Sequence, residues 1–411
     1  MNSWSSVYFP PALPGTVHKP LKIVDSYSES PIPIEGDEVT SYICGITPYD
    51  ATHLGHAATY LTFDLVHRYL IASGKRLNFT ENITDIDDPL LERAKRDAQD
   101  WQELAHSQVA LFKDDMTALR VIPPNNYLGV VESMEIITDK ISELVDTGIC
   151  YELEGDYYLS IGEVEGALEN LPCELKEAIS TFSQRGGDPD RIGKRHPLDT
   201  LIWLRQRPNE PSWSSEIGMG RPGWHIECVA IALSTLDSNQ ATSSITLQGG
   251  GSDLRFPHHY MTAVQARAMT GKPFAAVYAH SGMIEWQGEK MSKSKGNLVF
   301  VSKLLKSGWL GEEIRLALIN RDYAKDFAWD EKYLHEARGF LYRIGAALSR
   351  EDVAPTSYYV QEMVDSLASN LDIPRALASV AKWCEATERG ETGGTSGEIS
   401  RALDLYLGIA I

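Results

Sequence analysis

The stretch TSYICGITPYDATHLGH, residues 40–56, begins with a strand-like run and ends where a long amphipathic helix starts. Apolar residues then recur at spacings of three and four from Ala58 to Leu70. Gly74 is expected to end this helix, and a second strand-like run follows at 76–83. This order predicts a βαβ unit of a parallel sheet, in which the helix N-terminus favours a phosphate group.

Two short motifs carry groups that suit a triphosphate. His53 and His56 begin the predicted helix, and Gly55 between them lets a nucleotide approach the backbone closely. Far downstream, Lys290 and Lys293 place two ammonium groups three residues apart, which suits a leaving pyrophosphate. A histidine at a helix start is more often a capping or surface residue, and such a lysine pair is more often a solvated face. Together, on a parallel α/β pattern, the motifs predict cleavage of ATP at the α-phosphate.

Composition and charge limit the classes of protein to which the chain can belong. A length of 411 residues predicts two or three structural units, and a net charge of −19 disfavours nucleic acid as a partner because it repels a polyanion. The N-terminal segment lacks the apolar core of a secretory signal, and no run approaches the roughly 20 apolar residues of a membrane span. Five cysteines without paired spacing indicate a reducing compartment, so we expect a cytoplasmic protein with no membrane partner.

The sequence predicts an α/β fold with a Rossmann-type catalytic core, a mixed insertion and a C-terminal helical domain. A strand at 198–204 is expected to resume the core sheet after the insertion, within which residues 127–147 are predicted to form a helix. The expected regions are an irregular N-terminal arm at 1–19, a core at 20–120 and 197–285, a connective insertion at 121–196, a linking region with the lysine motif at 286–335, and a helical bundle at 336–411.

Three residues far apart in the sequence could converge on a metal ion. Cys44 lies at the end of the first predicted strand, where ligands bind in open parallel sheets, and Cys228 and His258 lie in later segments of the core. Zinc accepts thiolate and imidazole ligands in a tetrahedron, and a catalytic zinc site keeps one position open. A single cysteine is more often a small buried apolar residue, as we expect for the other three cysteines. The dispersed set by itself therefore leaves both interpretations open.

Several segments resemble those of cysteinyl-tRNA synthetases, which are class I aminoacyl-tRNA synthetases. The resemblance extends from about residue 20 to 335 and includes both motifs described above. Its other segments are CGITPYD at 44–50, NITDIDD at 82–88, RGGDPDR at 185–191, RPGWHIEC at 221–228, GGGSDL at 249–254, FPHH at 256–259 and HSGM at 280–283. We assign no catalytic role to the run at 185–191, because its Gly, Asp and Pro are typical of a turn.

This resemblance implies the substrates, the cofactors and the site residues. ATP with Mg²⁺ and L-cysteine are the implied substrates, and one zinc ion per chain, held by Cys44, Cys228 and His258, would capture the thiolate of the cysteine. The implied catalytic residues are His53, His56, Lys290 and Lys293. The implied contacts of the cysteinyl adenylate are Cys44, Gly45, Ile46, Thr47, Thr59, Asn82, Ile83, Thr84, Trp224, Gly251, Ser252, Asp253 and Ile284.

From the residues alone, several of these contacts keep alternatives. Asp253 could accept hydrogen bonds from ribose hydroxyls or from the substrate ammonium. Trp224 could wall a small cysteine pocket or simply pack in the core. Asn82 and Thr84 could serve only the chemistry of a turn after a strand. The sequence indicates no general base.

The chain departs from the synthetase pattern at the metal and at its C-terminal part. The synthetases supply a glutamate ligand four residues after the matched histidine, where Thr262 stands here, so we expect three protein ligands and one open position. In the loop after the first strand, Ile46 and Pro48 stand where the synthetases have Pro and Val. Residues 331–411 carry 8 Lys and Arg against 12 Asp and Glu, although a synthetase would need a basic tRNA-binding surface there.

These departures are similar to those of the actinobacterial cysteine ligases of mycothiol biosynthesis. The N-terminal Ser3-Trp4-Ser5, the segment at 44–50 and Gln248 carry this narrower resemblance. It implies that activated cysteine passes to the amine of glucosaminyl-inositol with release of AMP and pyrophosphate, so that small molecules, not tRNA, are the partners. We expect a monomer, although no residue pattern indicates the oligomeric state. One alternative is a truncated cysteinyl-tRNA synthetase, which the net charge and the short C-terminal part disfavour. The other is a non-catalytic paralogue that senses cysteine or ATP, and the intact histidine and lysine pairs disfavour it.

Overall fold

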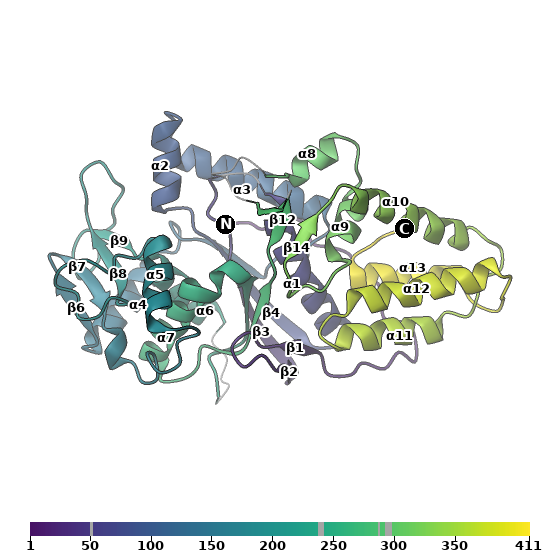
Figure 1. Cartoon of the computed structure of the whole chain (residues 1–411), viewed down its shortest axis with the longest axis horizontal. Coiled ribbons are helices and arrows are strands. Elements are labelled where there is room, and N and C mark those ends of the chain that lie inside the picture. The colour runs from purple at the N-terminus through teal and green to yellow at the C-terminus, as the bar shows by residue number, and fades with distance from the viewer. Residues whose placement is uncertain (50–51, 237–241, 287, 292–297) are drawn as a thin grey trace.

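A computed structural model describes the chain except for residues 50–51, 237–241, 287 and 292–297 and the side chains of Glu289 and Lys290. The molecule is elongated, with a parallel sheet at its centre, a smaller antiparallel sheet towards one end and a helical bundle at the other (Figure 1). Among the residues described, no helix is both long enough and apolar enough to span a bilayer.

The central sheet has five parallel strands in the order β11-β10-β3-β4-β5, which confirms the predicted α/β fold class. Both faces of β3 are buried, and successive residues point to opposite faces, so Tyr42 and Ile43 enter different hydrophobic cores. Helix α1 connects β3 to its parallel neighbour β4, as predicted. The bounds are β3 Glu38–Ile43, α1 Leu54–Ala72, β4 Arg76–Ile83, β5 Asn126–Gly129, β10 Ile245–Gly251 and β11 Ala275–Ser281.

Helix α1 begins and ends where the sequence predicts. His53 has an extended backbone, and its side chain accepts a hydrogen bond from the first turn, so it caps the helix N-terminus. Gly74 follows the last turn with φ at +84°, a left-handed conformation that favours glycine. The helix packs against the sheet, α9 and α13, and it is buried on nearly all sides between Leu54 and Leu70.

One hydrophobic core lies on each face of the sheet. The first contains residues of α1, α3 and the C-terminal helices, and the second contains residues of α4, α6 and α7. The arm at 1–19 forms neither helix nor strand, yet Trp4 packs edge-on against Phe112 and Tyr127 in the first core. Further bounds are β1 Lys22–Val24, β2 Pro31–Pro33, α2 Asp88–Arg96, α3 Trp101–Ala118, α6 Trp224–Thr235 and α7 Tyr260–Thr270.

The antiparallel sheet, in the order β6-β7-β8-β9, lies within residues 150–222. The prediction that residues 198–204 resume the core sheet is wrong, because β8 pairs with β7. Helix α4 begins only at Met134 and not at residue 127, and β5, which starts at residue 126, pairs with β4 in the central sheet. β5 has only four residues, which is too short to show a hydrophobic period. The apolar run of β8 predicts a strand but does not reveal which sheet that strand joins. The bounds are α4 Met134–Asp146, β6 Cys150–Leu153, β7 Asp156–Leu159, α5 Leu175–Gln184, β8 Thr200–Arg205 and β9 Gly220–Pro222.

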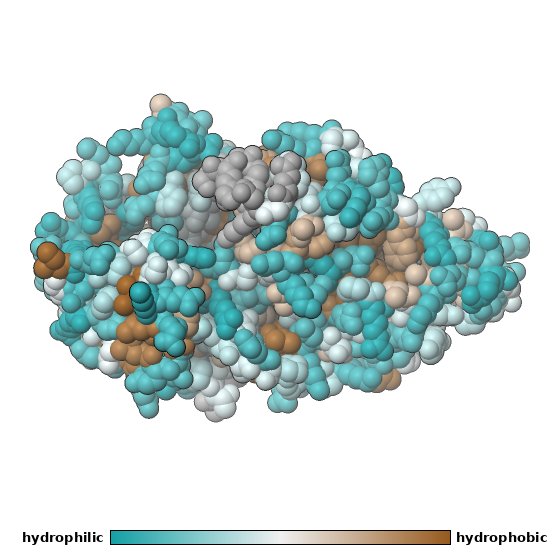
Figure 2. Space-filling model, viewed as in Figure 1, coloured by the Kyte–Doolittle hydropathy of each residue, from teal (hydrophilic) through white to brown (hydrophobic). Residues whose placement is uncertain are grey.

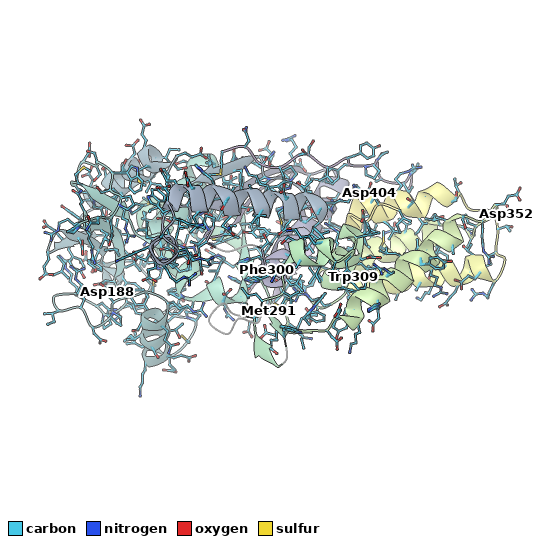
Figure 3. The ribbon with its side chains drawn as sticks, turned by 90° about the horizontal axis from the view of Figure 1, so that it is seen from above. Asp188, Met291, Phe300, Trp309, Asp352 and Asp404 are labelled. Atoms are coloured by element: carbon cyan, nitrogen blue, oxygen red, sulfur yellow. The ribbon has the colours of Figure 1, made fainter. Side chains whose placement is uncertain are left out.

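A small sheet and two helices connect the core to the C-terminal bundle, which consists of α10 to α13. Figure 3 shows Asp188 of the insertion and Asp352 of the bundle towards opposite ends of the molecule, with Met291 and Phe300 between them. The face in Figure 2 is mainly hydrophilic, and its apolar side chains lie in separate patches. The bounds are β12 Ile284–Trp286, β13 Glu289–Lys290, α8 Val301–Lys306, α9 Gly311–Ile319, β14 Phe327–Trp329, α10 Lys332–Leu348, α11 Ser357–Ala368, α12 Ile373–Glu388 and α13 Ser396–Leu407.

A buried ion network joins the bundle to the catalytic core. The Asp64 carboxylate on α1 accepts hydrogen bonds from Arg68 Nε at 2.7 Å and from Arg315 of α9, and none of these three side chains is exposed. It also accepts one from the Ile122 amide at 2.8 Å, while Arg68 donates to the Asp404 carbonyl of α13 at 2.8 Å. Burial alone would raise the pKa of Asp64, but the charges of Arg315 and Arg68 outweigh it and lower that pKa, so the carboxylate stays ionised.

We expect Asp64→Asn to lower the free energy of unfolding by about 3–5 kcal/mol, because it leaves two buried guanidinium groups without their counter-ion. Urea unfolding followed by circular dichroism measures the change. The matched control is Glu38→Gln, which breaks the Glu38–Arg76 pair, whose side chains are 72% and 74% exposed. An exposed pair contributes at most about 1 kcal/mol. Equal losses in the two variants would contradict the importance of the buried network.

Candidate active site

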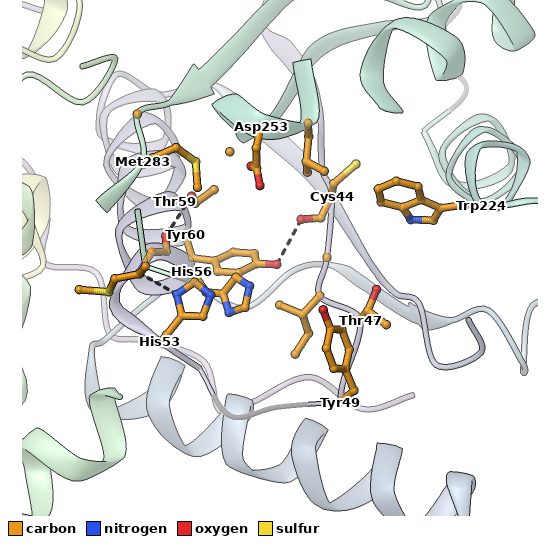
Figure 4. Close-up of a pocket in the computed structure, with 17 residues that line it drawn as sticks. Cys44, Thr47, Tyr49, His53, His56, Thr59, Tyr60, Trp224, Asp253 and Met283 are labelled. Carbon is orange, nitrogen blue, oxygen red and sulfur yellow. Dashed lines mark hydrogen bonds between the residues drawn. The ribbon is translucent and has the colours of Figure 1, made fainter. Parts of the chain in front are cut away.

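A cavity of about 430 Å³ opens at the carboxyl edge of the central sheet, where ligands bind in open α/β folds. It brings together the histidine motif, the loop after β3 and the end of β10, although these segments are far apart in sequence (Figure 4). Its lining consists of Cys44, Gly45, Ile46, Thr47, Tyr49, His53, Gly55, His56, Thr59, Tyr60, Trp224, Gly251, Asp253, Leu254, Gly282, Met283 and Met291.

The two histidines of the motif lie side by side at one end of the cavity. Their rings stack with centroids 3.8 Å apart. His53 Nδ1 accepts a hydrogen bond from the Gly55 amide at 3.1 Å, so the neutral ring carries its proton on Nε2 and presents that nitrogen as the donor. A Cβ atom at Gly55 would lie 2.8 Å from the His53 ring, which explains the glycine. The pair can therefore donate to an anion at the N-terminus of α1.

One described residue of the lysine motif lines the cavity. Met291 lines the cavity, and the backbone of Lys290 forms the short strand β13. The side chain of Lys290 and the whole of Lys293 lie outside the described part of the chain. Phe300, which follows the motif in sequence, forms a bridge with His53, so the chain lies beside the histidines at that residue.

The loop after β3 is held by the end of β4. The Asn82 side-chain oxygen accepts hydrogen bonds from the Gly45 amide at 3.0 Å and from the Tyr42 hydroxyl at 2.8 Å. The Thr84 amide donates to the Ile46 carbonyl at 3.0 Å. A Cβ atom at Gly45 would lie 1.4 Å from the Asn82 carbonyl oxygen, so only glycine fits this approach. The loop that carries Cys44 is therefore positioned by backbone and amide contacts.

Five predicted adenylate contacts do not line the cavity: Asn82, Ile83, Thr84, Ser252 and Ile284. Asn82 and Thr84 hold the loop by the hydrogen bonds described above. Ile83 and Ile284 are buried in the first hydrophobic core. The other eight predicted contacts all line it.

Cys44, Cys228 and His258 converge beside the cavity. Their ligand atoms all lie within 4.8 Å of one another, and all three residues are buried. Burial raises the pKa of the Cys44 thiol, whereas the hydrogen bond that this thiol donates holds the pKa of Cys228 well below its usual range. Two sulfur atoms and one imidazole form a donor set that fits a metal ion such as zinc. The hydroxyl of Thr262 donates to the His258 carbonyl at 2.7 Å, one turn earlier in the chain.

Two aromatic rings fix the imidazole of His258. Trp224 stacks on it with centroids 4.1 Å apart, which assigns the tryptophan to the site and not to general core packing. His225 places its Nδ1 2.9 Å from His258 Nδ1, so the opposite ring nitrogen, Nε2, is left facing Cys228 at 3.3 Å. Such a partner on the second nitrogen orients a metal-binding histidine.

A second chain of histidines lies behind Cys44, and the sequence interpretation missed it. His259 Nε2 lies 3.1 Å from Cys44 Sγ, and its Nδ1 lies 2.8 Å from His280 Nε2. His280 Nδ1 in turn lies 2.7 Å from the Ser26 hydroxyl. The only sequence signal was the presence of a second histidine in FPHH and another in HSGM. Tyr60 was missed too, although it follows His56 by one helical turn and donates to the Cys44 carbonyl at 3.1 Å.

Residues 31–339 match the family described as tRNA synthetases class I (C) catalytic domain. The chain is 47% identical over 422 residues, covering 100% of both sequences, to the Streptomyces griseus protein named L-cysteine:1D-myo-inositol 2-amino-2-deoxy-alpha-D-glucopyranoside ligase. The Streptomyces avermitilis protein of the same name is 48% identical over 419 residues, again with 100% of both sequences covered. The Mycobacterium tuberculosis methionyl-tRNA synthetase bound to methionyl-adenylate shares the fold, with a TM-score of 0.63, 14% identity, and coverage of 90% of this chain and 88% of that one.

Proposed function

We infer that this chain, which belongs to the family of class I (C) tRNA-synthetase catalytic domains, is an ATP-dependent ligase. It joins L-cysteine to the amine of 1D-myo-inositol 2-amino-2-deoxy-α-D-glucopyranoside in mycothiol biosynthesis and releases AMP and pyrophosphate. The observation that carries this function is the 47–48% identity, over full length, to proteins named for that reaction. The cavity supports it, because one volume holds an anion-binding end at His53 and His56 and a thiol-binding end at Cys44 and Trp224.

In the first step the carboxylate of cysteine attacks the α-phosphorus of ATP, and the bond to the β-phosphate breaks. Cysteinyl adenylate and pyrophosphate form. His53 and His56 donate to the α-phosphoryl oxygens, on which negative charge builds in the transition state. Lys290 and Lys293 hold the β- and γ-phosphates, whose charge Mg²⁺ shares. The N-terminus of α1 adds its backbone dipole at the same place.

We assign the metal position to zinc, held by Cys44, Cys228 and His258. Zinc bound there supplies a Lewis acid that selects a thiolate at its open fourth position. Thr262 does not fill that position, since its hydroxyl is bonded to the His258 carbonyl. Trp224 walls the side of the cavity next to the ligands and leaves room for a side chain as small as that of cysteine.

In the second step the neutral sugar amine attacks the carbonyl carbon of the adenylate, the amide bond forms, and AMP leaves. No covalent intermediate with the enzyme is needed, because the adenylate is already an activated acyl group. A small acceptor agrees with the charge of −19 and with an acidic C-terminal part, both of which disfavour tRNA. We also propose a cytoplasmic protein, because a site that depends on the free thiols of Cys44 and Cys228 needs a reducing compartment.

Loss of either thiol should abolish metal binding and cysteine activation together. We expect about one zinc per chain, and none in Cys44→Ser or Cys228→Ser, as measured by atomic emission alongside cysteine-dependent pyrophosphate exchange. Cys173→Ser, which changes a half-buried cysteine outside the cluster, is the control and should retain both properties. Serine should be rejected as a substrate, because its hydroxyl does not ionise on zinc as a thiol does. Full activity after removal of zinc would refute this role.

Each ATP motif should contribute to the first step without affecting the metal. We expect His56→Ala and Lys293→Ala to slow pyrophosphate exchange by ~10²–10³, the usual cost of losing one donor to developing charge. The zinc content should stay at one per chain. His106→Ala, an exposed change on α3, should exchange at the wild-type rate. Normal exchange in both motif variants would show that the motifs have another role.

The acceptor should be the glucosaminyl-inositol and not tRNA. We expect stoichiometric AMP and pyrophosphate when cysteine, ATP and this amine are supplied together. Moderate salt should have little effect on the rate, whereas binding of a polyanion weakens steeply with salt. The same protein should not charge tRNA in an assay that detects acid-stable cysteinyl-tRNA. Stable charging would favour the cysteinyl-tRNA synthetase alternative and leave the adenylation step intact.

A further inference from the structure

The short segment between β10 and α7 carries residues of both ends of the site. A 3₁₀ turn, Ser252–Leu254, follows β10, and the segment Arg255–His259, in which Phe256 has an extended backbone (φ −141°, ψ 136°), leads into α7. The Asp253 side chain points into the cavity (Figure 4), and His258 of the metal cluster follows five residues later. The segment therefore carries the cavity carboxylate and, further along, a metal-binding imidazole.

A short helical turn leaves carbonyl groups that have no partner within the turn. Two side chains from other parts of the molecule take up carbonyls of this segment. Arg185, at the end of α5 in the insertion, donates from Nη1 to the Asp253 carbonyl. Tyr27, in the turn of the N-terminal hairpin, donates its hydroxyl to the Arg255 carbonyl at 3.0 Å. The segment is thus held from two sides.

The backbone around Arg185 has a shape that requires glycine. Helix α5 ends at Gln184 with Arg185 as its C-cap, and Gly186 follows with φ at +88°, in the left-handed region. A Cβ atom at Gly187 would lie 2.4 Å from the Phe182 ring, which is buried. The RGG sequence therefore makes a tight turn that projects the arginine away from the end of the helix.

The rest of the RGGDPDR run anchors this turn to the insertion. Arg191 Nη1 donates to the Asp156 carboxylate and to the Tyr158 hydroxyl, each at 2.6 Å. The Lys194 ammonium lies 3.1 Å from the Asp188 carboxylate. These contacts all stay within the insertion, whereas Arg185 reaches out of it to the catalytic core.

We propose that Arg185 is a positioning residue for the active site, which acts through the Asp253 carbonyl to keep the Asp253 carboxylate facing the cavity. The proposal rests on the ligase function above, because it gives Asp253 a substrate group to bind. It also assigns a role to the RGGDPDR run: the ion pairs of its second half fix the loop, and its first residue transmits that position to the site. His258 is held separately, by His225 and by the Tyr27 hydrogen bond further along the segment.

The test is cysteine-dependent pyrophosphate exchange in wild type, Arg185→Ala and Arg185→Lys, with KM for cysteine and for ATP measured separately. The matched control is Arg195→Ala, an exposed arginine of the same loop that donates to Glu163 at 2.8 Å and lies over the Tyr151 ring. Loss of a charge-assisted hydrogen bond predicts a rise of about tenfold in KM for the substrate that Asp253 binds. We expect Arg185→Lys to restore part of that loss, because an ammonium can still donate to the carbonyl.

Zinc content and thermal stability separate positioning from a merely structural role. We expect Arg185→Ala to keep one zinc per chain and a Tm within about 2 °C of wild type, since an exposed substitution changes stability little. If Arg185→Ala and Arg195→Ala have the same KM values for both substrates, the proposal is wrong, whatever their Tm. If wild type itself shows no exchange, it is the ligase function that fails, so the two failures can be told apart.

Discussion

The convergence of two thiols and one imidazole in a buried place is the constraint on which the catalytic half of this molecule depends. Cys44, Cys228 and His258 come from the end of β3, from α6 and from the turn before α7, yet their ligand atoms lie within 4.8 Å of one another. Polar groups taken out of water need partners, and here each has one: His259 beside Cys44, His258 beside Cys228, and His225 beside His258. Those partners lie on the same three elements or next to them. The second hydrophobic core must therefore hold β3, α6 and the turn before α7 in a fixed arrangement.

On the other face of the sheet the corresponding anchor is ionic. Asp64 lies about two turns along α1 from His56, and its carboxylate binds guanidinium groups of α1 itself and of α9. A buried ion pair contributes little net stability compared with apolar packing, but its removal is costly, so it selects one arrangement of the helices over others. The bundle behind α1 can therefore set the direction of the helix whose N-terminus, in the proposed function, binds the phosphates of ATP.

The sequence predicted those parts of the fold that are encoded locally. The α1 helix, its histidine cap and the flanking strands follow from spacing within 45 residues, and the site motifs follow from a resemblance that spans most of the chain. The pairing of β5 with β4 and of β8 with β7 depends on distant partners, which periodicity does not reveal. The same limit applies to the site. His280, Ser26 and Tyr27 matter only because they lie beside His259 and Arg255 in space.

The cavity lies where the two cores meet, and this has a consequence for the chemistry. His53 and His56 belong to the helix of the first core, whereas Cys228 and His258 are fixed by the second. In the proposed function, a cysteinyl adenylate would have its thiol at one of these ends and its α-phosphate at the other, with its carbonyl between the two groups of anchors. Catalysis by positioning is lost when reacting groups are misplaced by about 1 Å. Changes in either core should therefore reduce the rate of bond formation more than the binding of either substrate fragment.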